Sequence, residues 1–231
     1  MSIHEAAQQG DVEAVKQLLA ANADLDEKDE EFRWTPLQHA IMSGQLDVVR
    51  ILIKYNSDIH VRDDNGCTLL HLAQTKEIAE LLINEGANIN ANGPSKSSPL
   101  SSAASDGNKE VAEFLIRQGA NVNSIDILGA TPLHEAASAD HKELVKMLVS
   151  YGANVNAIDR CGMSPLYKTA RTGKVGVVEL LLSLGAKVNI KDNEYNWTPL
   201  NWVKARELTE LEKILLKYGA KTAEELKAEG K

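Results

Sequence analysis

Apolar residues recur along this chain in short stripes with helical spacing, and residues 126–157 show the pattern most clearly. Thr131 can cap a first short helix with its hydroxyl, and Pro132 suits the first helical position, where no N–H is needed. A second stripe has apolar residues at i, i+1, i+4 and i+5, which are Leu144, Val145, Leu148 and Val149. The pattern predicts two short helices joined by a turn at residues 139–141.

The segment that follows these two helices has the pattern of a hairpin. Gly152 can supply the left-handed backbone that ends the second helix. An extended arm over residues 155–158 then leads to the next unit, and the corresponding turn of this unit lies at Leu128-Gly129. Each unit is therefore predicted to consist of a helix, a turn, a second helix and a hairpin.

The same unit repeats along the chain. A Thr-Pro-Leu motif or a close variant begins at Thr35, Thr68, Ser98, Thr131, Ser164 and Thr198, in steps of 33, 30, 33, 33 and 34 residues. A second landmark, Gly-Ala-Asn-Val-Asn or a variant, occurs seven times. The extra landmark predicts a first repeat that starts near Met1 and lacks its opening turn.

The segment GATPLHEAASADHKELVKMLVSYGANVNAID, at residues 129–159, resembles the ankyrin repeat over its full length, and the likeness covers essentially the whole chain. The resemblance implies an all-α fold, an ankyrin-repeat α-solenoid of about seven helix-turn-helix-hairpin units that include the terminal caps. It also implies that short helices line a concave face and that hairpins project from one edge. Each such unit buries its apolar face only against its neighbours, so the array shares one continuous core.

We expect a single ankyrin repeat domain over residues 1–231. The expected repeats are residues 1–29, 30–62, 63–92, 93–125, 126–158, 159–192 and 193–231. The last repeat is rich in charged residues, which suits a terminal cap with a polar outer face.

Two features depart from the regular pattern. The third repeat is three residues shorter than the others between Leu70 and Leu82, so its first helix or the following turn is expected to be shortened around Gln74-Thr75. The shortening is either a tolerated deletion that alters curvature or a notch for a partner. Arg33 and Lys96 also stand where other hairpins have glycine. Because long side chains disfavour the left-handed region, we expect a different turn in these two hairpins.

Composition and charge indicate which kinds of macromolecule the protein binds and in which cellular compartment it resides. The net charge of −8 disfavours binding to nucleic acid or anionic membranes and favours a basic partner. The N-terminus lacks the pattern of a signal peptide, and no stretch approaches the run of about 18 apolar residues that would span a membrane. Cys67 and Cys161 lie in hairpins three repeats apart and are expected to be free thiols. We therefore expect a cytoplasmic protein that is monomeric.

The residue types that carry catalysis do not cluster in any known motif. No phosphate-binding loop occurs, and Cys67 with His71 lacks the third ligand of a metal site. His4, His71 and His134 share one repeat position, where the resemblance implies a buried histidine that bonds to the backbone of the neighbouring hairpin. We therefore expect no metal, no cofactor and no catalytic site.

In a solenoid, the residues at the hairpin tips and at the ends of the first helices distinguish one protein from another, because packing constrains the core positions. The segments EEFRWTPL and NEYNWTPL, at residues 30–37 and 193–200, hold four of the ten aromatic residues. Exposed aromatic residues and methionine are common in binding hot spots. The expected partner-binding residues are Phe32, Trp34, Met42, Leu128, Met163, Arg171, Tyr195, Trp197 and Arg206. Alternatively, Trp34 and Trp197 only cover the terminal repeats.

These observations predict a non-enzymatic module that binds a protein or an extended peptide through its concave groove and hairpin tips. One alternative is an inhibitor or immunity-type protein that blocks an enzyme. A second alternative is a structural scaffold without a partner, and a third is an enzyme with a site of unrecognised type.

Overall fold

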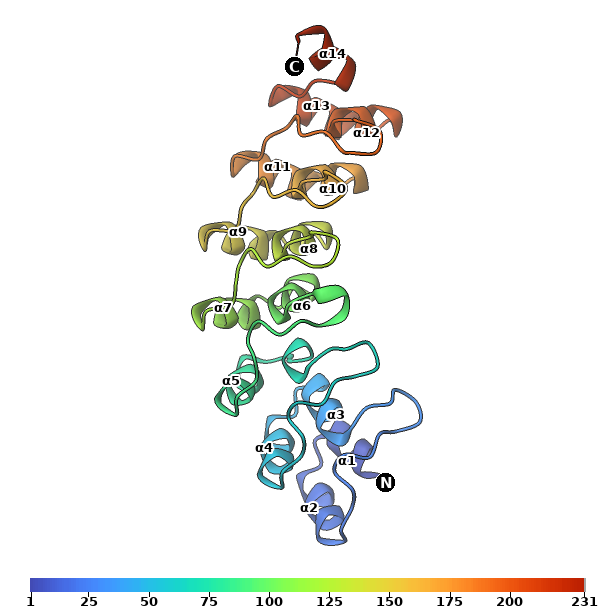
Figure 1. The fold of residues 1–231 in the computed structure, drawn as a ribbon, viewed down its shortest axis with the longest axis vertical. Coiled ribbons are helices and arrows are strands. Elements are labelled where there is room, and N and C mark those ends of the chain that lie inside the picture. Colours follow the sequence, from blue (N-terminus) through green and yellow to red (C-terminus); the bar gives the residue numbers. More distant parts are fainter. Residues whose placement is uncertain (231) are drawn as a thin grey trace. The chain divides into compact units, whose positions relative to one another are not determined.

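The computed structural model describes residues 1–230, which form fourteen α-helices and two short 3-10 helices (Figure 1). In chain order the α-helices are α1 (Ile3–Gln9), α2 (Val12–Ala20), α3 (Pro36–Met42), α4 (Leu46–Lys54), α5 (Lys76–Asn84), α6 (Pro99–Asp106), α7 (Lys109–Arg117), α8 (Pro132–Ser138), α9 (Lys142–Ser150), α10 (Pro165–Thr172), α11 (Val175–Ser183), α12 (Pro199–Ala205), α13 (Thr209–Lys217) and α14 (Ala223–Ala228). The 3-10 helices are η1 (Leu69–His71) and η2 (Pro94–Lys96). Within the described residues, β-pairing is limited to an isolated bridge between Arg62 and Thr68.

The helices belong to two compact units. The first unit comprises Met1–Ser102 and Glu110–Ala120, and the second comprises Ala103–Lys109 and the described residues from Asn121 onward. In the first unit α1 packs on α3, α2 packs on α4, and α4 packs on α5. In the second unit α8, α10 and α12 pack in succession, as do α9, α11 and α13. First helices therefore stack on first helices and second helices on second helices, which is the packing of an all-α solenoid.

The repeat at residues 126–157, which shows the sequence pattern most clearly, folds as that pattern predicts. Helix α8 begins at Pro132 and α9 begins at Lys142. The side chains of Leu144 and Leu148 are fully buried or nearly so. Gly152, with φ of 91°, has the left-handed backbone expected after α9. The predicted apolar stripes therefore position both helices, because each helix buries one apolar face against its neighbours.

The third repeat is shortened where the sequence predicts. Its first helix is reduced to the three residues of η1, and α5 begins at Lys76 after its cap Thr75. The side-chain hydroxyl of Thr75 accepts a hydrogen bond from the N–H of Ile78 at 3.3 Å. The missing residues thus come from the first helix, while the second helix keeps its full length of nine residues.

The hairpin at Arg33 corrects one prediction. Arg33 adopts a left-handed φ of 58°, close to the 78° of Gly129 at the matching position, so the expectation of a different turn there is wrong. The carboxylate of Asp29 holds this turn by accepting hydrogen bonds from the N–H groups of Phe32 and Trp34, each at 3.0 Å. These bonds offset the strain of the left-handed conformation.

The hairpin at Lys96 does adopt a different turn. Ser95 and Lys96 both have positive φ, 50° and 62°, within η2. The N–H of Gly93 donates to the carbonyl of Ser97 at 2.8 Å and closes this turn. The prediction is therefore confirmed for this hairpin.

Replacing Arg33 with glycine is expected to raise the free energy of unfolding by about 0.5–1 kcal/mol, because glycine occupies left-handed backbone without steric strain. The ion pair between Arg33 and Asp64 spans 3.8 Å between exposed side chains, so its loss has little effect. Urea unfolding of wild type, Arg33→Gly and the control Arg33→Lys measures the difference. A stability of Arg33→Gly at or below that of wild type would contradict this account.

Candidate protein-interaction surface

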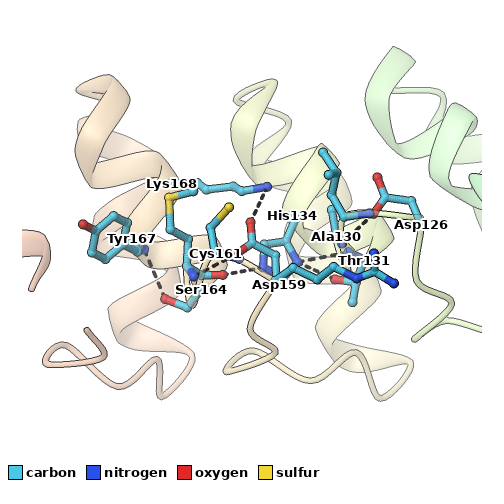
Figure 2. A network of polar contacts seen from close by, with 12 residues as sticks. Asp126, Ala130, Thr131, His134, Asp159, Cys161, Ser164, Tyr167 and Lys168 are labelled. Atoms are coloured by element: carbon cyan, nitrogen blue, oxygen red, sulfur yellow. Dashed lines mark hydrogen bonds and ion pairs between the residues drawn. The ribbon is translucent and has the colours of Figure 1, made fainter. Parts of the chain in front are cut away.

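An aspartate fixes the backbone of most hairpins. The carboxylates of Asp29, Asp63, Asp126, Asp159 and Asp192 each accept hydrogen bonds from two N–H groups of their own hairpin. Figure 2 shows Asp126 and Asp159, the latter with N–H···O distances of 2.9 Å to both Cys161 and Met163. Because these bonds fix the turns, the side chains at the tips project from a defined backbone.

The second oxygen of three of these aspartates contacts a side chain from the first helix that follows its hairpin. Asp29 Oδ2 lies 2.8 Å from His39 Nε2, Asp159 Oδ2 lies 3.0 Å from Lys168 Nζ, and Asp192 Oδ2 lies 3.4 Å from Trp202 Nε1. His39, Lys168 and Trp202 each stand four residues after the Thr or Ser of the motif. Sequence reasoning missed these pairs, although the recurrence of aspartate before five of the six motifs was a signal for them.

The shared histidine position has the structural role that the family resemblance implies. His71 and His134 are buried, and their Nε2 atoms lie 3.2 Å and 3.1 Å from the carbonyl oxygens of Ser97 and Met163. Figure 2 shows His134 among its neighbours. The N–H of Thr131 donates to Nδ1 of His134 at 3.1 Å, so Nε2 carries the proton that Met163 accepts. Burial lowers the pKa of His134 to about 4. Its imidazole is therefore neutral near pH 7 and joins one repeat to the next.

Tyr167 occupies the equivalent position in the sixth repeat and joins a different polar network. It is fully buried, and its hydroxyl donates to Asp192 Oδ2 and accepts from Trp202 Nε1. Burial, followed by the hydrogen bond to Asp192, raises the pKa of Tyr167. The phenol therefore stays neutral and bridges the hairpin aspartate to α12.

One aromatic cluster lies in the first unit. The ring centroids of Phe32 and Trp34 are 5.5 Å apart, and those of Trp34 and His39 are 5.4 Å apart. His4 completes this cluster at 5.8 Å from His39. Phe32 is 50% exposed whereas Trp34 is half-buried. Trp34 thus supports a ring that faces solvent.

A second aromatic cluster lies in the second unit. The ring of Trp197 packs against Tyr195 at 5.6 Å and against Trp202 at 5.1 Å. The guanidinium carbon of Arg171 lies 5.1 Å from the centre of the Trp202 ring, within reach of a cation–π interaction. Tyr195 is 53% exposed, while both tryptophans are half-buried. The two look-alike hairpins therefore present Phe32 and Tyr195 outward and hold Trp34 and Trp197 behind them.

The nine predicted partner-binding residues fall into separate groups. Phe32, Trp34 and Met42 belong to the first unit, where Phe32 and Met42 are exposed. Leu128, Met163, Arg171, Tyr195, Trp197 and Arg206 belong to the second unit, where Leu128, Arg171, Tyr195 and Arg206 are exposed. Arg171 connects several members of the second group, because its Nη1 lies 3.5 Å from Met163 Sδ and its carbonyl accepts from Arg206 Nη1.

An apolar patch around Leu128 includes residues that sequence reasoning missed. Ile125, Ile127, Leu128 and Ile158 are exposed, by 63%, 43%, 58% and 59%. Ile125 and Ile158 occupy the same position of neighbouring repeats, and the N–H of Arg160 donates to the carbonyl of Leu128 at 2.8 Å. The run Ile-Asp-Ile-Leu at residues 125–128 was a signal for this exposure. It lies on an extended arm, and the solvent-facing side of such an arm does not require large apolar residues for folding.

Cysteine, histidine and carboxylate side chains are spread through the repeats. Neither cysteine takes part in a disulfide, as predicted, and Cys161 is exposed. His71 lies near Cys67 in sequence, but its ring nitrogens contact Thr68 and Ser97. Within residues 1–230, no three such side chains gather closely enough to hold a metal ion. No helix in the same range is both long and apolar enough to span a bilayer.

Comparison with known families decides the assignment. A model of ankyrin repeats in three copies matches residues 3–93 and 75–159, and a model of ankyrin repeats in many copies matches residues 148–201. The chain belongs to the ankyrin repeat family. The predicted family and the predicted all-α solenoid are therefore confirmed. Ankyrin repeats are generally protein-interaction modules and are typically non-enzymatic.

Similar proteins share only part of their length with this ankyrin repeat protein. The 2-5A-dependent ribonuclease of Mus musculus is 40% identical over 67 residues, which cover 29% of this chain and 9% of that protein. Inversin of Homo sapiens is 34% identical over 89 residues, covering 37% and 8%. Protein phosphatase 1 regulatory subunit 27 of Mus musculus is 37% identical over 86 residues, covering 36% and 56%. The chain thus matches at most about half of any of these three proteins.

Solved ankyrin repeat structures match more of the chain. The ankyrin repeat domain of human ASB11 superimposes with a TM-score of 0.84 at 24% identity and covers 96% of this chain and 99% of its own. That likeness establishes the fold alone. An ankyrin repeat domain from Acinetobacter baumannii has a TM-score of 0.68 at 31% identity and covers 80% of this chain and 98% of its own.

Proposed function

We propose that this chain is a non-enzymatic module that binds a protein or an extended peptide through the concave groove typical of its family and through its hairpin tips. One observation carries the proposal: large apolar side chains are exposed on hairpins whose backbone is fixed. Phe32, Leu128 and Tyr195 are each at least 50% exposed. In each of these hairpins an aspartate accepts two N–H groups.

Rigid, exposed rings favour binding because little side-chain entropy is lost when the partner associates. The half-buried Trp34 and Trp197 support Phe32 and Tyr195, so both exposed rings are held before a partner arrives. Aromatic anchors of this kind dominate the energies of protein interfaces. The exposed aliphatic patch around Leu128 adds apolar area in the second unit.

The roles of the histidines support a non-enzymatic function. Histidine is the side chain most often used in general acid–base chemistry, but the ring nitrogens of His71 and His134 bond to the hairpin backbone. The net charge of −8 favours a protein partner with a basic segment over nucleic acid or a membrane. The proposal further places the chain in the cytoplasm as a monomer.

A regulatory consequence of binding is the second candidate. One relative is named as a regulatory subunit of protein phosphatase 1, and it matches this chain over 56% of its own length. By this analogy, binding would alter the activity of an enzyme partner, as the inhibitor alternative supposes. The binding surface would be the same, so one experiment addresses both candidates.

The test compares proteins captured from source lysate by wild type and by a Phe32→Ala/Tyr195→Ala variant. A matched control is Tyr55→Ala/Tyr218→Ala, because these rings are 52% and 43% exposed at the ends of second helices instead of on hairpin tips. The tip variant is expected to recover a specific partner about tenfold less than wild type, as loss of an interface anchor implies. The control is expected to recover it fully.

Equal recovery by all three proteins would show that the hairpin tips do not bind the partner. If none of them captures a specific protein, the scaffold alternative gains support. Circular dichroism and thermal unfolding of the three proteins show whether the substitutions leave the fold intact.

A further inference from the structure

Two arginines in the second unit have no carboxylate partner within the described residues. Arg171 lies near the end of α10, and Arg206 follows α12 as its cap residue. Both side chains are exposed, and neither takes part in an ion pair in the part of the chain that the structure describes. Two unpaired guanidinium groups in a chain of net charge −8 mark a local region of positive charge.

The side chain of Arg206 is in direct contact with the backbone of Arg171. Arg206 Nη1 donates to the carbonyl oxygen of Arg171 at 2.5 Å. The guanidinium of Arg171 stacks over the ring of Trp202 and touches Met163 Sδ at 3.5 Å. A guanidinium has five N–H donors, so these contacts leave most donors of both residues available for a ligand.

Two buried carboxylates of the adjoining hairpins are engaged elsewhere. Asp159 is buried and pairs with Lys168 at 3.0 Å. Asp192 is buried and accepts from the hydroxyl of Tyr167 and from the N–H groups of its own hairpin. Because neither arginine forms an ion pair with a carboxylate in the described part of the chain, a ligand can supply the counter-ion.

Aromatic and sulfur-containing side chains border the arginine pair. The ring of Trp202 beneath Arg171 packs against Trp197 and against the half-exposed Tyr195, with centroid distances of 5.1 Å and 5.8 Å. Met163 also contacts Arg171 through its sulfur. A ligand on the two guanidinium groups would thus contact apolar surface as well, which favours a peptide with mixed side chains over a simple ion.

The lack of spare backbone donors beside the pair favours carboxylate over phosphate. Phosphate sites at helix N-termini and in backbone nests use backbone N–H groups. The N–H groups of Met163 and Tyr195, the hairpin residues next to the pair, already donate to Asp159 and Asp192. The planar forks of arginine that remain match a carboxylate or a phosphate with two parallel hydrogen bonds, so the experiment below compares both groups.

We propose that Arg171 and Arg206, with Tyr195, Trp197 and Met163 beside them, form the docking site for an acidic peptide segment of the partner protein. Asp or Glu side chains of that segment would pair with the two guanidinium groups, and an adjacent apolar residue would lie on the rings. The inference rests on the proposed binding function. It revises the expectation of a basic partner at this place, because net charge acts weakly beyond a Debye length of about 8 Å.

Fluorescence polarisation with the full chain tests the inference. The probe is a short labelled peptide that carries Glu, Leu and Ser, and the competitors are its Lys-for-Glu and phosphoserine counterparts and a single-stranded oligonucleotide. Wild type is expected to bind the Glu peptide, and Arg171→Glu/Arg206→Glu is expected to weaken binding by at least about tenfold. The charge-matched control Arg50→Glu/Lys54→Glu alters exposed residues of α4 in the other unit and is expected to bind within about twofold of wild type.

A second variant separates geometry from charge and guards against misfolding. Arg171→Lys/Arg206→Lys keeps both charges but loses the planar forks and the stacking on Trp202, so binding is expected to weaken by about three- to tenfold. Tighter binding of the Lys, phosphoserine or oligonucleotide probe, or unchanged binding by both arginine variants, would overturn the inference.

Capture from lysate separates this inference from the broader function. If Arg171→Glu/Arg206→Glu captures the partner as wild type does while the Phe32→Ala/Tyr195→Ala variant does not, the arginine site is wrong and the binding function stands. If wild type captures no partner, the proposed function fails as well.

Discussion

Replacing Tyr167 with alanine is expected to lower the free energy of unfolding by about 3–5 kcal/mol, as for other large aromatic residues in a core. Tyr167 is the largest of the fully buried side chains. Loss of the Tyr167 side chain leaves a cavity in the core beside α10. The substitution also removes the hydroxyl that bridges Asp192 and Trp202. A buried carboxylate that loses a donor adds a desolvation cost to the cavity.

Two milder variants divide this effect into packing and hydrogen bonding. Tyr167→Phe keeps the ring and is expected to cost about 1–3 kcal/mol, the penalty for unsatisfied buried polar groups. Tyr167→His introduces the residue found at the equivalent positions His71 and His134. Urea unfolding followed by circular dichroism measures all three variants. An alanine variant no less stable than the phenylalanine variant would contradict the packing argument.

Acidification from about pH 7 to pH 4 is expected to remove about 3 kcal/mol of stability through His134 alone. Burial lowers the pKa of His134 to about 4 in the folded chain, whereas the unfolded chain has the ordinary value of 6.5. Between these values the unfolded state binds more protons, so stability rises with pH. The contribution is fully present above the unfolded pKa and is lost as the pH falls toward the folded pKa. Burial also lowers the pKa of His71, which adds a loss in the same direction.

The variant His134→Gln isolates this contribution from the titration of carboxylates. Glutamine already occupies the matching position at Gln38, where its side-chain oxygen accepts from the N–H of Thr35 at 2.9 Å. The variant is expected to keep the repeat folded and to show a shallower loss of stability across the same pH range. Urea unfolding at a series of pH values gives both curves. Parallel curves would show that His134 does not titrate as its burial implies.

Local patterns were sufficient to predict the repeats and their helices. The caps, the apolar stripes and the glycine or asparagine after each second helix all act within one repeat, so they could be recognised along the chain. The shortened third repeat was also visible as a change in spacing. Arg33 was misjudged because its left-handed backbone depends on hydrogen bonds that the N–H groups of Phe32 and Trp34 donate to Asp29, and residue spacing does not reveal these bonds.

The candidate site was only partly predictable for the same physical reason. Phe32, Leu128 and Tyr195 were recognised as hairpin residues, and the structure places all three in solvent. The sequence did not show that Phe32 and Tyr195 are exposed while Trp34 and Trp197 are half-buried. The burial of a ring depends on which other rings pack against it. The exposed isoleucines were missed because an apolar residue on an extended arm reads as core until the neighbouring hairpin is placed.

The sequence by itself thus determined the family, the repeat period and the helices, because each unit repeats the same local interactions. Only the tertiary structure decided which side chains of different repeats contact one another. It set Tyr167 against Asp192 and Trp202, and it joined Arg206 to Arg171. Such contacts connect residues that are distant in sequence, and their geometry follows from the stacking of whole repeats. The chemistry that a partner would encounter is therefore a property of the stacked repeats.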